Sequence, residues 1–171
     1  MKNTPIIKIF TINHAMRQVK NPQFKLDEIP ISKIKIDLKS RDDIPPLLLG
    51  LQYVYTTLEL RDKVFAILEK HIKPNTDKSN GRPGMELWKI LVFGVLRLNL
   101  NWDYDRLVEM ANNHKTIRLM LGHCSFNDDH KYKLRTLKDN VSLLTPEILD
   151  KLNTTVVEAG HNLVKKKRTK S

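Results

Sequence analysis

The longest nearly continuous apolar run in the chain covers residues 85–98, directly after the turn sequence of residues 81–84. Only Glu86, Lys89 and Arg97 interrupt this run with charge. A helix that is apolar on almost every side has to be surrounded by other elements. This one is too short, and too often interrupted by charge, to span a bilayer. We therefore expect residues 85–98 to form the central helix of a helical domain.

Other stretches show apolar residues at helical spacing and predict the helices around it. The predicted helices cover residues 47–72, with a break near Thr56 and Thr57, and residues 102–113, 115–121, 131–140 and 146 onward. The last begins with a capping Thr145, a first-turn proline and an acid, which is a strong start signal. Its apolar residues step three and four apart and form a narrow seam: Leu149, Leu152, Val156, Ala159 and Leu163. The seam either packs on the central helix or pairs with a second copy of the chain.

The N-terminal part is less regular. Three prolines interrupt the first 30 residues, whereas residues 31–38 alternate apolar and polar positions in the period of a half-buried strand. No second strand is predicted, so this stretch is either an extended segment or a strand completed by missing residues. The predicted fold is an all-α multi-helix bundle of five or six helices with helix-turn-helix-like units. It divides into a partly extended N-terminal arm (1–38), a helical domain (39–164) and a basic tail (165–171).

Charge points to a polyanionic partner. The chain has 30 Lys and Arg against 19 Asp and Glu, a net charge of +11 and a pI near 9.8. Such a field favours nucleic acid first and an anionic membrane second. No amphipathic basic helix, lipidation signal or signal peptide supports a membrane. The single cysteine, Cys124, is typical of a reducing cytoplasm, so we expect a cytoplasmic protein whose partner is double-stranded DNA.

The succession of short helices and tight turns over residues 85–140 is typical of DNA-binding helix-turn-helix units. The candidate reading helix, 131–140, carries Lys131, Lys133, Arg135 and Lys138. The competing one carries Lys115 and Arg118. The alternative is that these are solvated faces of ordinary bundle helices.

Two further basic features are candidates for DNA contact. Arg82, in an extended Gly/Pro segment, suits the narrow minor groove, although a helix-initiating turn explains the same residues. The tail carries Lys165, Lys166, Lys167 and Arg168, which suit phosphates through counterion release. A solvated tail is the alternative.

The sequence contains only weak indications of a metal site or of a catalytic site. His114, His123, Cys124 and His130 lie close in sequence, but their spacing matches no familiar zinc pattern. The paired acids at 42–43, 103 and 105, and 128–129 come without a phosphate loop or a sheet scaffold, and two of them fit helix caps. We expect no metal, no cofactor and no catalytic residue.

Several runs resemble, in the same order, the N-terminal region of bacterial insertion-sequence transposases of the DDE type. The group that is most similar is the one usually filed as an unclassified insertion-sequence family. The longest run is Gly-Arg-Pro-Gly-Met-Glu-Leu-Trp-Lys-Ile-Leu-Val-Phe-Gly-Val-Leu-Arg from Gly81. The others are Lys-Ser-Arg-Asp-Asp-Ile-Pro from Lys39, Gly-Leu-Gln-Tyr from Gly50, Asn-Trp-Asp-Tyr-Asp-Arg-Leu from Asn101, Met-Leu-Gly-His from Met120, Lys-Asp-Asn-Val-Ser-Leu-Leu-Thr-Pro-Glu from Lys138 and Gly-His-Asn-Leu-Val-Lys-Lys-Lys from Gly160. Each run alone is weak evidence, whereas their order is fairly specific.

The resemblance implies a helical domain that binds the terminal inverted repeats of a mobile element and helps to assemble the transposition complex. In that family a ribonuclease-H-like catalytic domain follows, and this chain ends about where the linker to it would begin. We therefore expect a truncated transposase that is not an enzyme on its own. The alternatives are an oligomerisation module, in which the seam forms a homodimer, a regulatory truncated transposase, and a metal-dependent nuclease.

Overall fold

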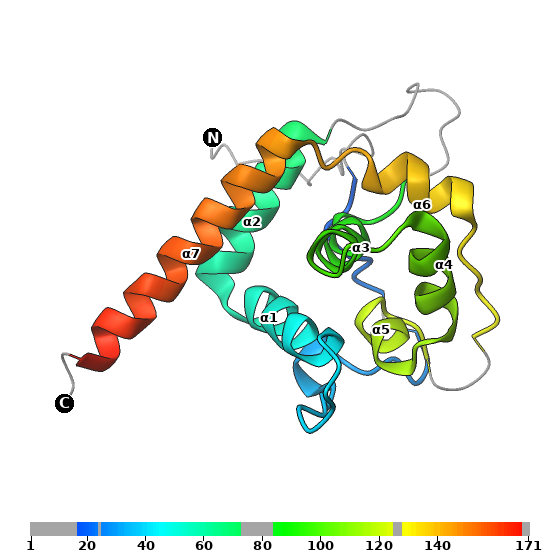
Figure 1. The fold of residues 1–171 in the computed structure, drawn as a ribbon, viewed down its shortest axis with the longest axis horizontal. Helices are drawn as coiled ribbons and strands as arrows, with labels where there is room; N and C mark the ends of the chain where they lie inside the picture. Colours follow the sequence, from blue (N-terminus) through cyan, green and yellow to red (C-terminus); the bar gives the residue numbers. More distant parts are fainter. Residues whose placement is uncertain (1–16, 24, 73–83, 125–127, 169–171) are drawn as a thin grey trace, which may run out of the picture.

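The computed structural model describes residues 17–23, 25–72, 84–124 and 128–168, with side chains up to residue 161 in the last range. These residues form an all-α fold in which seven α-helices pack together and no strand occurs (Figure 1). The elements are η1 (Ile31–Lys33, a 3-10 helix), α1 (Ile44–Thr56), α2 (Leu58–His71), α3 (Leu87–Asn99), α4 (Tyr104–Asn113), α5 (Lys115–Met120), α6 (Leu134–Val141) and α7 (Pro146–Arg168). The predicted all-α class is confirmed, with seven helices in the described part of the chain against the five or six expected.

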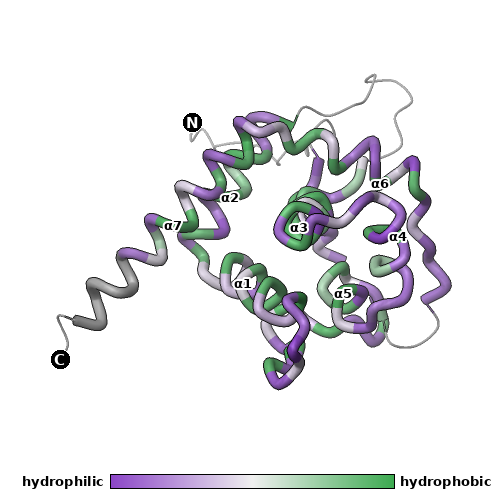
Figure 2. Tube along the Cα trace, viewed as in Figure 1, coloured by the Kyte–Doolittle hydropathy of each residue, from purple (hydrophilic) through white to green (hydrophobic). Residues whose placement is uncertain are grey.

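Helix α3 is the central element, as its sequence predicts. Eight of its thirteen residues are buried, and it packs against α1, α2, α4 and α6. Figure 1 shows α3 nearly end-on with the other helices around it, and Figure 2 shows its apolar character. Trp88 packs against the rings of Tyr55 and Phe65, and its indole N–H donates to the Met120 carbonyl at 2.6 Å. Burial of such large side chains supplies most of the stability of a domain of this size.

The first N–H groups of α3 are satisfied by the N-terminal segment. The N–H groups of Leu87 and Trp88 donate to the carbonyl oxygens of Gln18 and Val19 at 3.0 and 2.9 Å. Helix starts leave such donors without partners inside the helix, so this pairing caps α3. The predicted arm is therefore packed against the bundle from residue 17 onward, and residues 1–16 lie outside the described residues.

Arg17 fixes the turn that precedes α3. Its guanidinium donates to the Met85 carbonyl at 3.1 Å and to Asn140 Oδ1 at 2.7 Å, which joins the N-terminal segment to α3 and α6. A Cβ atom at Gly84 would lie 2.7 Å from Arg17 Cζ. The guanidinium of an arginine from a distant segment therefore occupies the space beside Gly84, and a side chain at this position would displace it.

Residues 31–38 do not form a strand, so that alternative in the sequence interpretation is wrong. Ile31 and Ile34 are buried, and η1 replaces the start of the expected strand. The side-chain amide of Gln52 on α1 donates to the carbonyls of Ile31 and Ile34 at 2.7 and 2.9 Å. The alternation is real, but a helix side chain, rather than a neighbouring strand, pairs with the backbone.

The long helix predicted over residues 47–72 is two helices with a break at the predicted place. Thr57 between them has extended backbone angles, φ −87° and ψ 103°. The Thr56 hydroxyl donates to the Gln52 carbonyl, one turn earlier in α1, at 2.8 Å. α1 begins at Ile44, three residues before the predicted start, and Pro45 lies in its first turn.

Helix α5 has the predicted start, whereas α4 begins two residues and α6 three residues later than predicted. Asp103 accepts from the Arg106 N–H at 2.7 Å and caps α4, and His114 Nδ1 accepts from the Ile117 N–H at 3.2 Å and caps α5. α6 begins only at Leu134. The prediction that residues 131–133 belong to this helix is therefore wrong.

Helix α7 packs chiefly on α2 rather than on α3, which corrects the expected partner of its seam. Ile148 and Leu152 are buried, and the Lys151 ammonium lies 2.6 Å from Glu147 Oε1 and 3.2 Å from His71 Nε2 at the end of α2. The C-terminal part of α7 passes the start of α2 and continues away from the bundle (Figure 1).

Candidate nucleic-acid interface

The basic residues predicted for the reading helix lie on two different elements. Residues 128–133, which we call the strap, lie outside any helix and lead into α6. Tyr132 is buried, and its backbone N–H and carbonyl are both bonded to the side-chain amide of Asn112 on α4, at 2.7 and 3.0 Å. Lys131 and Lys133 belong to the strap, whereas Arg135 and Lys138 belong to α6.

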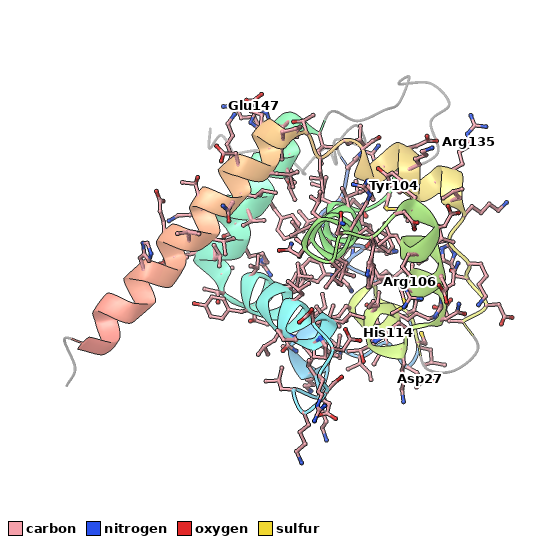
Figure 3. The ribbon with its side chains drawn as sticks, viewed as in Figure 1. Asp27, Tyr104, Arg106, His114, Arg135 and Glu147 are labelled. Atoms are coloured by element: carbon pink, nitrogen blue, oxygen red, sulfur yellow. The ribbon has the colours of Figure 1, made fainter. Side chains whose placement is uncertain are left out.

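All four of these cations are exposed. Figure 3 shows Arg135 pointing away from the bundle, and its side chain is 93% exposed. Its one ion pair, with Asp139 at 3.7 Å, is exposed as well and contributes little. Helix α6 buries only Leu137 and Val141, so most of its surface is available to a partner.

The other predicted site residues are placed differently. Lys115 is exposed at the first position of α5. Arg118 on α5 is largely buried, its side chain being 14% exposed. Its guanidinium donates to the carbonyls of Asp128 and His130 at 2.9 and 3.1 Å. Arg118 therefore holds the strap, and in this structure it does not present its charge to solvent as Lys115 does.

Beside Arg118, a buried imidazole joins both ends of the strap. His123 lies just after α5 and is 2% exposed. Its Nδ1 lies 2.7 Å from Asp128 Oδ2, and its Nε2 lies 2.7 Å from the Tyr132 hydroxyl. His130 stacks on His123 with ring centroids 5.1 Å apart. The strap is thus held along its length by the side chains of Arg118, His123 and Asn112, of which His123 is buried.

The protonation states follow from burial and hydrogen bonding. Burial lowers the pKa of His123 to about 4, despite the opposing effect of Asp128. Burial raises the pKa of Asp128, but hydrogen bonds from His123 and from the His130 N–H outweigh it and hold that pKa below its usual range. A neutral His123 therefore donates from Nδ1 to an ionised Asp128 and accepts from Tyr132 at Nε2. Burial also raises the pKa of Tyr132, which keeps its hydroxyl a donor.

Some basic residues lie outside what the structure describes. Arg82 falls in residues 73–83, so the minor-groove prediction for it has no structural test. The backbone of Lys165, Lys166, Lys167 and Arg168 belongs to α7, but their side chains are outside the described residues.

Two features of the structure were not predicted from the sequence. Lys33, Lys35, Lys39 and Arg41 are exposed beside η1 and α1, and in the described part of the chain they form no ion pair; the alternation over residues 31–38 was the available signal. The hydrogen bonds of His123 to Asp128 and Tyr132 had no such signal, because spacings of five and nine residues match neither helix nor strand.

The face of α4 limits where a polyanion can lie. Its exposed side chains include Asp103, Asp105 and Glu109 against one cation, Arg106, which pairs with Glu109 at 2.8 Å. A phosphate backbone is repelled there, so the strap and α6 are the better candidates on this side of the molecule.

The metal and catalytic candidates have structural partners. Among the described residues, no three His, Cys, Asp or Glu side chains are placed to hold a metal ion. His114 and Asp103 cap helices, and Asp42 accepts from the Ile44 N–H at 3.1 Å. Cys124 is partly buried, and its thiol donates to the Leu26 carbonyl at 3.1 Å.

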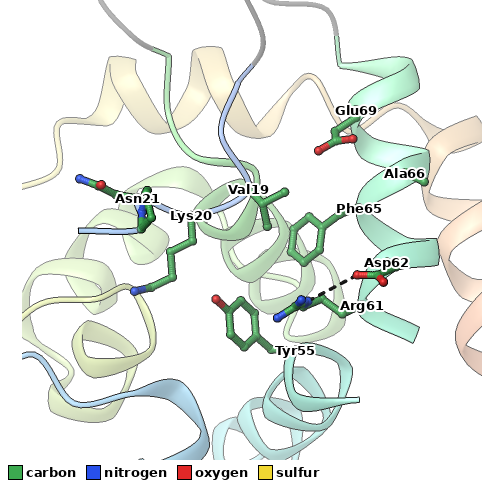
Figure 4. A pocket seen from close by; sticks show the side chains of 10 residues that line it. Val19, Lys20, Asn21, Tyr55, Arg61, Asp62, Phe65, Ala66 and Glu69 are labelled. Atoms are coloured by element: carbon green, nitrogen blue, oxygen red, sulfur yellow. Dashed lines mark ion pairs between the residues drawn. The ribbon is translucent and has the colours of Figure 1, made fainter. Parts of the chain in front are cut away.

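A pocket of about 520 Å³ lies between the N-terminal segment and the α1–α2 corner (Figure 4). Aromatic and charged side chains share its wall, among them Tyr55, Phe65 and Arg61. Arg61 lies 5.6 Å from the Tyr55 ring centroid and pairs with Asp62 at 3.7 Å. This pocket brings together none of the predicted site residues.

Among the described residues, no helix is both long enough and apolar enough to cross a bilayer. Comparisons with protein-family models, with curated proteins and with solved structures find no match.

Proposed function

We propose that this chain is the DNA-binding N-terminal domain of an insertion-sequence transposase, which holds the ends of the element and is not catalytic on its own. The ordered set of runs that resembles this family supports the proposal, as does a net charge of +11. Its partner is then double-stranded DNA that carries the terminal inverted repeats. α6 is the candidate reading helix of a helix-turn-helix-like unit with α4 and α5.

The main support for the proposal is a group of exposed cations along the strap and α6. Lys131, Lys133, Arg135 and Lys138 follow one another along the strap and α6, and all four are exposed. α6 leaves most of its surface uncovered, as a helix that enters the major groove requires. The acidic face of α4 gives the opposite sign nearby, so the charge distribution favours one docking side.

DNA binding is tested by titrating the chain with labelled duplexes at 50 and 200 mM salt. One duplex carries the repeats that flank the coding sequence, and a control carries the same bases in scrambled order. We expect tighter binding to the repeats and a fall of roughly 10³-fold in affinity between the two salt concentrations if six phosphates are contacted. Equal affinity for both duplexes removes the sequence-specific part of the proposal, and no binding removes all of it.

Catalysis is assigned to a separate domain in this proposal. Incubation of labelled repeat DNA with the chain and magnesium or manganese should therefore leave the DNA intact. Metal-dependent cleavage that co-purifies with the chain would favour the nuclease alternative.

An assembly module is the second candidate function, because α7 exposes apolar side chains. Val156 and Val157 are 40% and 45% exposed. If α7 pairs with a second copy, sedimentation should show a dimer that Val157→Asp dissociates. Leu152→Asp is a poor test, since Leu152 is buried within the chain. A monomer at all concentrations rules this function out.

A further inference from the structure

The fold holds the backbone of the strap at every second residue, at positions 128, 130 and 132. Arg118 donates to the carbonyls of Asp128 and His130, and Asn112 bonds the backbone of Tyr132. Tyr132 is buried and His130, although exposed, stacks on His123, whereas the intervening positions 129, 131 and 133 are all exposed. Lys133 has extended backbone angles, φ −99° and ψ 144°.

This alternation sets the spacing of the cations. Two residues of extended chain span about 6.6 Å, and consecutive phosphates of one DNA strand lie roughly 7 Å apart, because the strand winds about an axis along which each nucleotide rises about 3.4 Å. Lys131 and Lys133 are therefore spaced like phosphates of a single strand, and Arg135 continues the series into the first turn of α6. Within the described part of the chain, neither lysine forms an ion pair. Asp129 carries the opposite charge, so the matching stretch begins at Lys131.

We propose that the strap is a rigid binding edge for one phosphodiester strand of duplex DNA, and that Arg118 and Asn112 act as positioning residues behind it. This inference rests on the proposed function and changes its geometry. Lys131 and Lys133 bind phosphates from an extended segment rather than from a helix. Arg118, a predicted phosphate ligand, works from the interior instead.

The hydrogen bonds explain why an arginine serves at position 118. Its planar fork donates from two nitrogens to two carbonyls that lie two residues apart, and a lysine, with a single nitrogen, cannot reproduce this bridge. Asn112 needs both a donor and an acceptor for Tyr132. A backbone fixed before binding does not lose its freedom on binding, which lowers the cost of association.

The first test neutralises the strap. The double variant Lys131→Gln, Lys133→Gln should fold as the wild type does, because both side chains are exposed. The slope of log affinity against log salt should become less steep by about 1.8, since each lost phosphate contact removes about 0.9. The matched control is Lys63→Gln, Lys70→Gln on α2, which makes the same charge change at two exposed positions. This control should leave the slope unchanged.

The second test separates positioning from direct contact. Arg118→Lys keeps the charge but loses the carbonyl bridge, so affinity should fall roughly tenfold with the slope unchanged. Asn112→Ala should act in the same way without any change in charge. Circular dichroism and thermal melting identify the variants that remain folded.

The outcomes distinguish this inference from the function on which it rests. If the wild type binds DNA with a steep salt slope but the double lysine variant has the same slope, the strap inference is wrong and the proposed function stands. If Arg118→Lys keeps full affinity while Arg118→Gln flattens the slope, Arg118 is a phosphate ligand and its positioning role is wrong. If the wild type does not bind DNA, the proposed function itself fails.

Discussion

The imidazole of His123 is a buried base that the native fold keeps neutral. Its pKa is lowered to about 4 by burial, whereas an exposed histidine in the unfolded chain has a pKa near 6.5. Between these values the unfolded chain binds a proton that the folded chain does not. The His123 contribution to stability is therefore complete above pH 6.5 and is lost as the pH falls toward 4.

This linkage gives a pH prediction. Between pH 7 and pH 5, His123 should cost the wild type about 2 kcal/mol of unfolding free energy, measured by urea denaturation at each pH. His123→Gln removes the titration, so its pH dependence should be smaller by about that amount. His114 and His130, whose pKa values burial also lowers, remain in the variant and serve as the internal control. Identical pH profiles for the two proteins would contradict this account.

Single residues also show what local sequence can reveal. The Asp103 cap and the end of α3, where Asn101 adopts φ 50°, were predictable because a cap and a left-handed turn depend on neighbours in the chain. The role of Arg118 was not, since its acceptors lie 10 and 12 residues away. A sequence shows that a cation is present, but only the fold shows whether solvent reaches it.

At the scale of elements, two glycines in helices differ in the space that surrounds them. A Cβ atom at Gly94 in α3 would lie 2.2 Å from Leu144 Cδ1, whereas one at Gly50 in α1 would meet nothing within 4 Å. Gly94 is thus the point where the loop between α6 and α7 reaches the central helix, and Gly50 is a helix position with open space around it.

Alanine substitutions at the two glycines should change the unfolding free energy in opposite directions. Gly94→Ala should lower the unfolding free energy by about 1–2 kcal/mol, because the clash with Leu144 outweighs the gain in helix propensity. Gly50→Ala should raise it by about 0.5–1 kcal/mol. Denaturant titration measures both, and Gly94→Ala, Leu144→Ala should show coupling that relieves the clash. Stabilisation by Gly94→Ala would mean that Leu144 does not pack there.

Element prediction succeeded where burial is periodic and failed where the partner lies far away. The apolar run of α3 predicted a central helix, and the break at Thr57 was visible from the change in pattern. The segment 31–38 has the period of a strand, but Gln52 on α1 takes the place of a neighbouring strand. Residues 131–133 of the strap were wrongly predicted as the start of α6, which begins at Leu134, because Lys131 and Lys133 carry the same charge as the basic residues of that helix.

At the scale of the molecule, the positive charge is unevenly distributed. Residues 1–16, 73–83 and 162–171 contain ten Lys or Arg and one Asp, which is nine of the eleven net charges. The part of the chain whose side chains are described is therefore close to neutral. In this part of the chain, the attraction for a polyanion therefore depends on local groups of cations such as the strap rather than on the net charge of the protein.

Helix α7 imposes a rotational constraint. From Leu152, which is buried, to Arg168 the helix rises about 24 Å without interruption. A helix turns about 100° per residue, so the angular phase of its basic end is set by the contact with α2. One residue inserted after Leu152 would rotate the basic end of α7, and any ligand bound to it, by about 100° relative to the bundle. Seven inserted residues would restore the original orientation and place the basic end about 10 Å farther from the bundle.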